Sequence, residues 1–109
     1  MNRDHKVVRD NKVAVLYSPG FGAGWSTWNN EHKNIVYDPT VVAWVESGKP
    51  EDARPRLEAT LDEKYPGVYL GGLRDLEIQW LPLNTWFIVE EYDGSERIVL
   101  QEGIVWKIA

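Results

Sequence analysis

The chain has 109 residues, of which 43% are hydrophobic and 27% are charged, and this is the composition of one folded domain spanning residues 1–109. It contains no cysteine, which excludes disulfide bonds and thiolate metal ligands. Its formal net charge of −5 disfavours non-specific binding to nucleic acid, which depends on neutralising phosphates. No run approaches the ~18 apolar residues of a membrane span. The polar start of the chain predicts no signal peptide. We therefore expect a cytoplasmic protein with no membrane partner.

The first half of the chain predicts one strand and two helices. Residues 13–17 form a short apolar run that ends at Ser-Pro-Gly, which is typical of a buried strand. Asp38 and Pro39 predict the start of a helix, because Asp caps a first turn and Pro fits its first position. Gly48 predicts the end of that helix. A second helix is expected between residues 50 and 66, where apolar side chains recur every four residues.

The second half of the chain predicts strands, because its hydrophobic period changes from helical to two. Asp93-Gly94 predicts a type I′ turn between two of these strands. The expected strands cover residues 68–70, 76–80, 85–90, 97–100 and 104–108. Together these elements predict an α+β fold, with a mostly antiparallel sheet of about five strands and two helices packed on one face.

The segment from Ser18 to Asn29, which we call the Gly/Trp loop, is the most unusual part of the chain. It combines glycines at alternate positions with two tryptophans and a phenylalanine. Such glycines permit positive φ and close approach, and aromatic rings in a loop are costly to leave in water unless they pack or bind. A dinucleotide fingerprint needs a glycine where Trp25 stands, and a Walker loop needs a lysine that is absent here. Both of these nucleotide motifs are therefore excluded.

Two interpretations of the Gly/Trp loop stay open. In the first, backbone N–H groups near Ser26 and Thr27 cradle an anion while a tryptophan stacks on a planar ring and Arg74 contacts phosphate. The candidate ligand-binding residues are Ser18, Gly20, Phe21, Gly22, Gly24, Trp25, Ser26, Thr27, Trp28, Asn29 and Arg74. In the second, the loop packs into its own core or against a neighbouring subunit. Six tryptophans are many for a core of this size, so we expect a homo-oligomer.

An enzymatic interpretation depends on carboxylates near the predicted hairpin. Glu90 and Glu96 are expected to face each other across it, and paired acids can support glycosidic or phosphoester chemistry, with a divalent metal where they converge. The alternative is a charged face that protects the hairpin edges from other strands. Because no acid–base set stands out, we favour a protein without enzymatic activity and assign no catalytic residue, metal or cofactor.

The sequence of the Gly/Trp loop resembles one carried by a group of small phage and prophage proteins. Residues 68–72, 75–78 and 91–96 resemble segments of the same group. The resemblance implies a viral or prophage origin and expression in the cytoplasm of a bacterial host, and it supplies no catalytic residues. We therefore expect a non-enzymatic accessory protein that binds a nucleotide-derived host signal and counters a defence pathway. The alternatives are an inhibitor or adaptor of a host protein, and a small carboxylate-dependent hydrolase or transferase.

Overall fold

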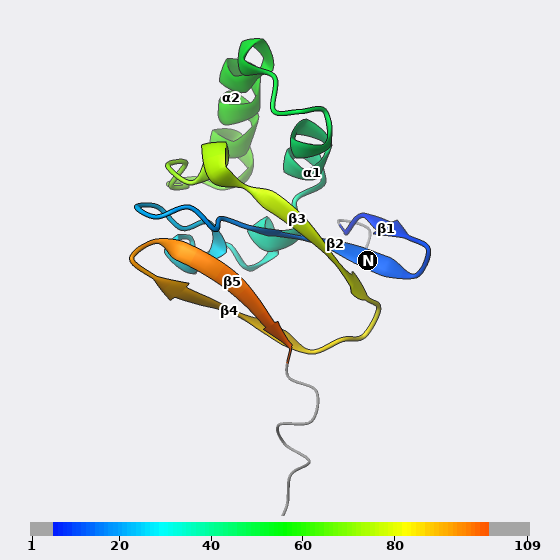
Figure 1. The fold of residues 1–109 in the computed structure, drawn as a ribbon. Helices are drawn as coiled ribbons and strands as arrows, with labels where there is room; N and C mark the ends of the chain where they lie inside the picture. Colours follow the sequence, from blue (N-terminus) through cyan, green and yellow to red (C-terminus); the bar gives the residue numbers. More distant parts are fainter. Residues whose placement is uncertain (1–5, 101–109) are drawn as a thin grey trace, which may run out of the picture.

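The computed structural model describes residues 6–100, which form a three-stranded sheet, a separate β-hairpin and two helices. Figure 1 shows their arrangement. The strands are β1 (Val8–Arg9), β2 (Lys12–Tyr17), β3 (Glu77–Pro82), β4 (Phe87–Tyr92) and β5 (Ser95–Leu100). The helices are α1 (Pro39–Glu46) and α2 (Arg54–Lys64), and 3₁₀ turns cover Ser26–Trp28, Lys33–Tyr37, Glu51–Ala53 and Leu73–Asp75. The α+β fold class predicted from the sequence is confirmed.

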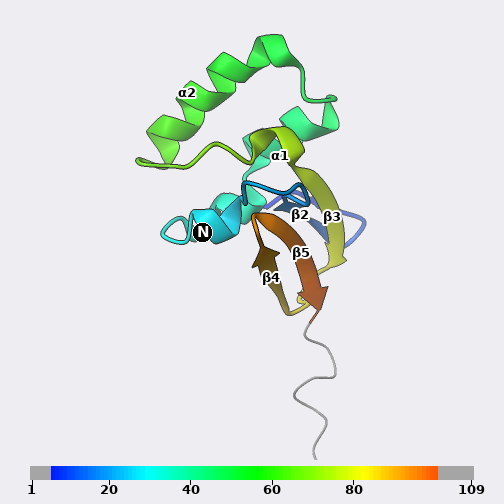
Figure 2. The ribbon, with the colours of Figure 1, turned by 60° about the vertical axis from the view of Figure 1, so that its left-hand side comes forward.

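Strand β2 lies at the centre of the fold, and side chains on both of its faces are buried. It pairs antiparallel with β1 on one side and with β3 on the other. Successive side chains of a strand point to opposite faces. Ala14 and Leu16 accordingly join a core cluster with α1 and α2, whereas Val13 and Val15 join a second cluster against the hairpin. Figure 2 shows β2 between the helices and the hairpin.

Local capping signals set the start of α1. The Asp38 carboxylate accepts hydrogen bonds from the backbone N–H groups of Thr40 at 2.9 Å and Val41 at 3.0 Å, and Pro39 is the first helical residue. The second Asp38 oxygen accepts hydrogen bonds from Lys64 and Tyr65 at the end of α2. The predicted cap is thus confirmed, and it also ties the start of one helix to the end of the other.

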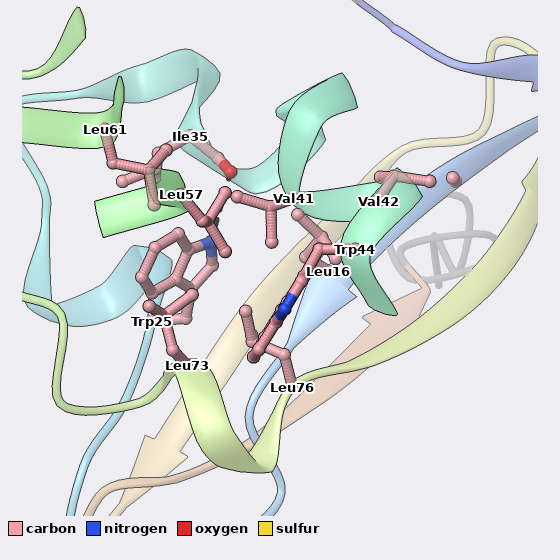
Figure 3. Packing of buried hydrophobic residues seen from close by; sticks show 11 residues of the cluster. Leu16, Trp25, Ile35, Val41, Val42, Trp44, Leu57, Leu61, Leu73 and Leu76 are labelled. Carbon is pink, nitrogen blue, oxygen red and sulfur yellow. Dashed lines mark hydrogen bonds between the residues drawn. The ribbon is translucent and has the colours of Figure 1, made fainter. Parts of the chain in front are cut away.

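Helix α2 begins with a proline in its first turn, as the sequence predicts. Its apolar face is narrow, because Leu57 and Leu61 are its only buried side chains. Both leucines belong to the same core cluster as Trp25, which comes from the Gly/Trp loop (Figure 3). The loop therefore supplies part of the core that holds α2 in place.

The hairpin turn is of the predicted type I′, since Asp93 (φ 54°) and Gly94 (φ 84°) both have positive φ. Strands β4 and β5 pair only with each other within residues 6–100, so the five strands lie in two sheets rather than in one. The reason is packing, because Val89 and Ile98 of the hairpin lie face to face with Val13 and Val15 of β2 instead of extending the sheet edge to edge.

Two further predictions for the second half of the chain have different outcomes. Residues 68–70 form no strand and instead lead into the Leu73–Asp75 turn. The expected strand at 104–108 lies outside the described residues. Within residues 6–100, no helix is both long enough and apolar enough to cross a membrane.

Candidate functional site

The Gly/Trp loop leaves the end of β2 and folds back over the core. Its first tryptophan, Trp25, is fully buried, and its indole N–H donates a 3.1 Å hydrogen bond to the backbone oxygen of Ile35. A ring enclosed on all sides cannot stack on a ligand. The expectation that Trp25 forms a stacking surface is therefore corrected, because the ring is buried within the core cluster that includes Leu57 and Leu73.

The carboxylate of Glu96 on β5 holds the loop in place. The side chain is only 2% exposed and accepts four hydrogen bonds from the loop. One oxygen accepts the backbone N–H of Ser18 at 2.9 Å. The other accepts the backbone N–H groups of Trp25 at 2.7 Å and Thr27 at 3.0 Å, and the Thr27 hydroxyl at 2.6 Å. The loop amides expected to cradle an external anion thus bind an anion that belongs to the protein itself.

The side chains of Ser18 and Asn29 also form hydrogen bonds within the protein, whereas Ser26 is half-buried in the 3₁₀ turn. The Ser18 hydroxyl donates to the backbone oxygen of Ala23 at 2.9 Å. The Asn29 amide donates to the backbone oxygens of Trp25 and Tyr69, and its own oxygen accepts the Tyr69 N–H at 2.7 Å. Since Ser18 and Asn29 are also buried, neither is free to hold polar groups of a ligand.

The glycines of the loop serve close packing within the protein. A Cβ atom on Gly24 would lie 2.7 Å from the Thr27 hydroxyl and 3.0 Å from the Glu96 carboxylate. A Cβ on Gly72, in the second glycine turn, would meet the backbone oxygen of Gly24. The two glycine-rich segments therefore touch each other, which the sequence did not predict.

Four of the candidate residues are exposed, namely Phe21, Gly22, Trp28 and Arg74. Phe21, at the tip of the loop, is 74% exposed. Trp28 is 39% exposed, and its ring lies against Tyr69 with the ring centroids 5.2 Å apart. Arg74 is exposed in the Leu73–Asp75 turn. The candidate residues thus divide into buried and half-buried residues that shape the loop and a small exposed group that could meet a partner.

The exposed tip of the loop lies beside the hairpin turn. The backbone N–H of Gly22 donates to the Asp93 oxygen at 2.8 Å, and the Ser95 hydroxyl donates to the Pro19 oxygen at 2.7 Å. Phe21 and Tyr92, which is 76% exposed, line the same open hollow of about 270 Å³. We call its lining the aromatic acidic surface; it consists of Phe21, Glu90, Glu91, Tyr92, Ser95 and Arg97.

The charges of the aromatic acidic surface are mostly negative. Arg97 contributes the one positive charge of the lining, and it already pairs with Glu90 at 2.7 Å. The Glu91 carboxylate accepts a 2.8 Å hydrogen bond from the Gly94 N–H, and the residue is exposed to solvent. Sequence reasoning missed Tyr92 and Arg97 as site residues, because only the strand register and the folded loop bring them together with Phe21.

The expected pairing of Glu90 with Glu96 is wrong. The register of the hairpin places Glu90 opposite Arg97 and Glu96 opposite Glu91, so the two acids point to opposite faces. Glu90 is exposed on the outer face, whereas Glu96 is buried under the loop. In the described part of the chain, no three His, Asp or Glu side chains lie close enough to hold a metal ion.

Comparisons of the chain with protein-family models, with curated proteins and with solved structures found no match in any of the three. The resemblance of the Gly/Trp loop to phage proteins therefore stays a prediction.

Proposed function

We propose that this chain is a non-enzymatic protein-binding module that docks a positively charged partner protein on the aromatic acidic surface. The observation that carries the proposal is the pair of exposed rings, Phe21 and Tyr92, which come from distant parts of the chain and line one hollow with carboxylates. Exposed aromatic side chains are costly in water. Aromatic and arginine side chains also contribute most of the binding energy at protein interfaces.

The charge of this surface favours a protein over a nucleotide. A phosphate group at the hollow would meet Glu90 and Glu91, and the only arginine in the lining is already paired. Opposite charges across an interface steer association and exclude wrong partners. The net charge of −5 for the whole chain acts in the same direction. A basic surface of a partner protein therefore fits this site better than an anionic small molecule.

The rigidity of the loop supports the same role. Binding costs less when the interacting side chains are already ordered. The backbone that carries Phe21 is anchored by the Glu96 hydrogen bonds on one side and by the bond from Gly22 to Asp93 on the other. The buried part of the Gly/Trp loop thus presents its tip in a single position.

The partner that we propose is a protein of a bacterial host, inhibited or recruited by this chain. The host follows from the resemblance to phage proteins, and the positive charge of the partner follows from the site. Two copies of this chain would bring like charges together at this surface, which disfavours a homodimer formed through it. A homo-oligomer that uses another face is compatible with the proposal.

The test is affinity capture from a bacterial lysate, followed by measurement with the purified partner. Three versions of the chain are immobilised: wild type, the double variant Phe21→Ala/Tyr92→Ala, and Trp86→Ala. Trp86 is 80% exposed and lies outside this surface, so Trp86→Ala controls for non-specific binding by exposed aromatic side chains. We expect one protein to bind wild type and Trp86→Ala in equal amounts, and its affinity for the double variant to fall at least about tenfold.

Salt and ligand measurements complete the test. Binding of the purified partner should weaken as salt rises, because the attraction is partly electrostatic. Equal capture by all three versions, or affinity that does not change with salt, contradicts the proposal. Thermal stabilisation by cyclic dinucleotides or ADP-ribose derivatives that the double variant abolishes would instead support the nucleotide-ligand interpretation.

A further inference from the structure

A second hollow lies at the other end of the hairpin, and the proposed function does not use it. It has a volume of about 440 Å³ and is lined by Tyr37, Asn84, Thr85, Trp86 and Phe87, which we call the Trp86 groove. A smaller hollow of about 140 Å³ shares four of these residues and reaches Val13, Val15 and Leu81. The groove therefore opens directly onto the core cluster between β2 and the hairpin.

Large apolar side chains in and beside the groove are in contact with water. Trp86 is 80% exposed, Leu83 is 42% exposed and Leu100 is 38% exposed. These three residues come from the connection between β3 and β4 and from the end of β5. Exposed apolar side chains that gather in one region often mark an interaction site.

The chain itself provides a segment of suitable length and composition. The described part of β5 ends at Leu100, which pairs with Phe87 in the lining of the groove. Figure 1 shows the end of β5 beside the connection that carries Trp86. Three residues separate Leu100 from Ile104, and an extended chain spans about 3.3–3.6 Å per residue. The connection from Leu100 can therefore span about 14 Å, which is long enough for Ile104 to reach the groove without any rearrangement of the hairpin.

The pattern of that segment matches a one-sided apolar surface. Residues 104–108 read Ile-Val-Trp-Lys-Ile, so in extended conformation Ile104, Trp106 and Ile108 share one face while Lys107 lies on the other. Large apolar side chains on one face and a charge on the opposite face are typical of a strand that lies on a core.

We propose that residues 104–108 dock in the Trp86 groove of their own chain, with Ile104, Trp106 and Ile108 facing the groove. The docked segment covers Trp86 and closes the exposed side of the second core cluster. The groove and the aromatic acidic surface lie at opposite ends of β4, which are about 17 Å apart for a strand of this length. The inference is therefore independent of the proposed function.

The absence of native cysteine makes a disulfide test direct. In the full-length chain, Thr85→Cys combined with Ile104→Cys places one thiol at the groove and one on the docking segment. The control pair is Ser95→Cys with Ile104→Cys, since Ser95 lies at the opposite end of the hairpin. Under mild oxidation we expect the first pair to form a disulfide within one chain at least tenfold faster than the control pair.

A second comparison separates docking from simple proximity. Adding Trp86→Ala to the first pair should slow disulfide formation at least tenfold, because the groove loses its largest apolar side chain. Adding Tyr92→Ala, which removes an equally exposed ring outside the groove, should leave the rate unchanged. Equal rates for the two cysteine pairs, or no effect of Trp86→Ala, overturn the proposal. Disulfide-linked dimers in place of internal disulfides show that the segment of a second copy fills the groove, and they overturn it as well.

Discussion

Replacing Glu96 tests whether a buried carboxylate holds the Gly/Trp loop in its observed conformation. The structure gives this side chain four donors, and three of them are backbone N–H groups, those of Ser18, Trp25 and Thr27. Glu96→Ala removes the acceptor of all three without providing another. Because a buried donor without a partner costs free energy, the folded state should be destabilised relative to the unfolded chain, in which water satisfies these groups.

The size of the effect follows from the number of donors left unpaired. Each unsatisfied buried N–H costs about 1–3 kcal/mol. Relaxation of the loop, and the removal of a buried charge, both offset part of this cost. We therefore expect Glu96→Ala to lower the free energy of unfolding by about 3 kcal/mol, which is a large share of the roughly 5–15 kcal/mol that stabilises a domain. Glu96→Gln keeps one oxygen but turns an NH₂ group toward donors, so we expect a loss of about 2 kcal/mol.

Urea unfolding followed by tryptophan fluorescence measures these losses, because the ring of Trp25 is buried in the folded state. The matched control is Glu90→Gln on the neighbouring strand, where an exposed ion pair with Arg97 contributes at most about 1 kcal/mol. If Glu96→Ala lies within 1 kcal/mol of wild type, or if Glu96→Gln costs no more than Glu90→Gln, the buried carboxylate does not hold the loop and the reasoning is refuted.

Two further predictions concern glycine packing and alkaline pH. Gly94→Ala should lower the free energy of unfolding by about 1–3 kcal/mol more than Gly48→Ala, as measured by urea unfolding. Both glycines have positive φ (84° and 89°), but only at Gly94 would a Cβ meet the backbone of the loop. Equal losses for the two variants contradict close packing of the hairpin and the loop. Burial, and then the hydrogen bond to Asp38, raise the pKa of Tyr65 above its ordinary value of 10.0. Because the folded state holds this proton more tightly than the unfolded chain, the stabilisation is complete below pH 10 and is lost above it. The unfolding free energy is measured from pH 8 to roughly pH 12, the range over which a phenol titrates. It should fall more steeply with pH for wild type than for Tyr65→Phe, and parallel curves contradict the prediction.

Elements with local signals could be predicted from the sequence. The cap at Asp38 and Pro39, the turn at Asp93-Gly94 and the strand near residues 13–17 are all confirmed. Each depends on side chains and backbone angles within a few residues, so neighbouring residues contain the information. The Gly/Trp loop was also recognised as unusual, because its glycines and aromatic rings are close in the chain.

The arrangement of the site depended on contacts between residues that are far apart in the chain. Glu96 lies 69 to 78 residues from its donors in the loop, and no local pattern distinguishes it from the exposed Glu90. Its burial follows from the hairpin register and from packing of the hairpin on β2. The same packing divides the strands between two sheets, buries Trp25 under α2 and brings Phe21 beside Tyr92. Neighbouring residues were therefore enough to predict the cap, the hairpin turn and the central strand, but not the absence of a strand at residues 68–70. Burial and the faces on which side chains meet arise only when distant segments compete for one core.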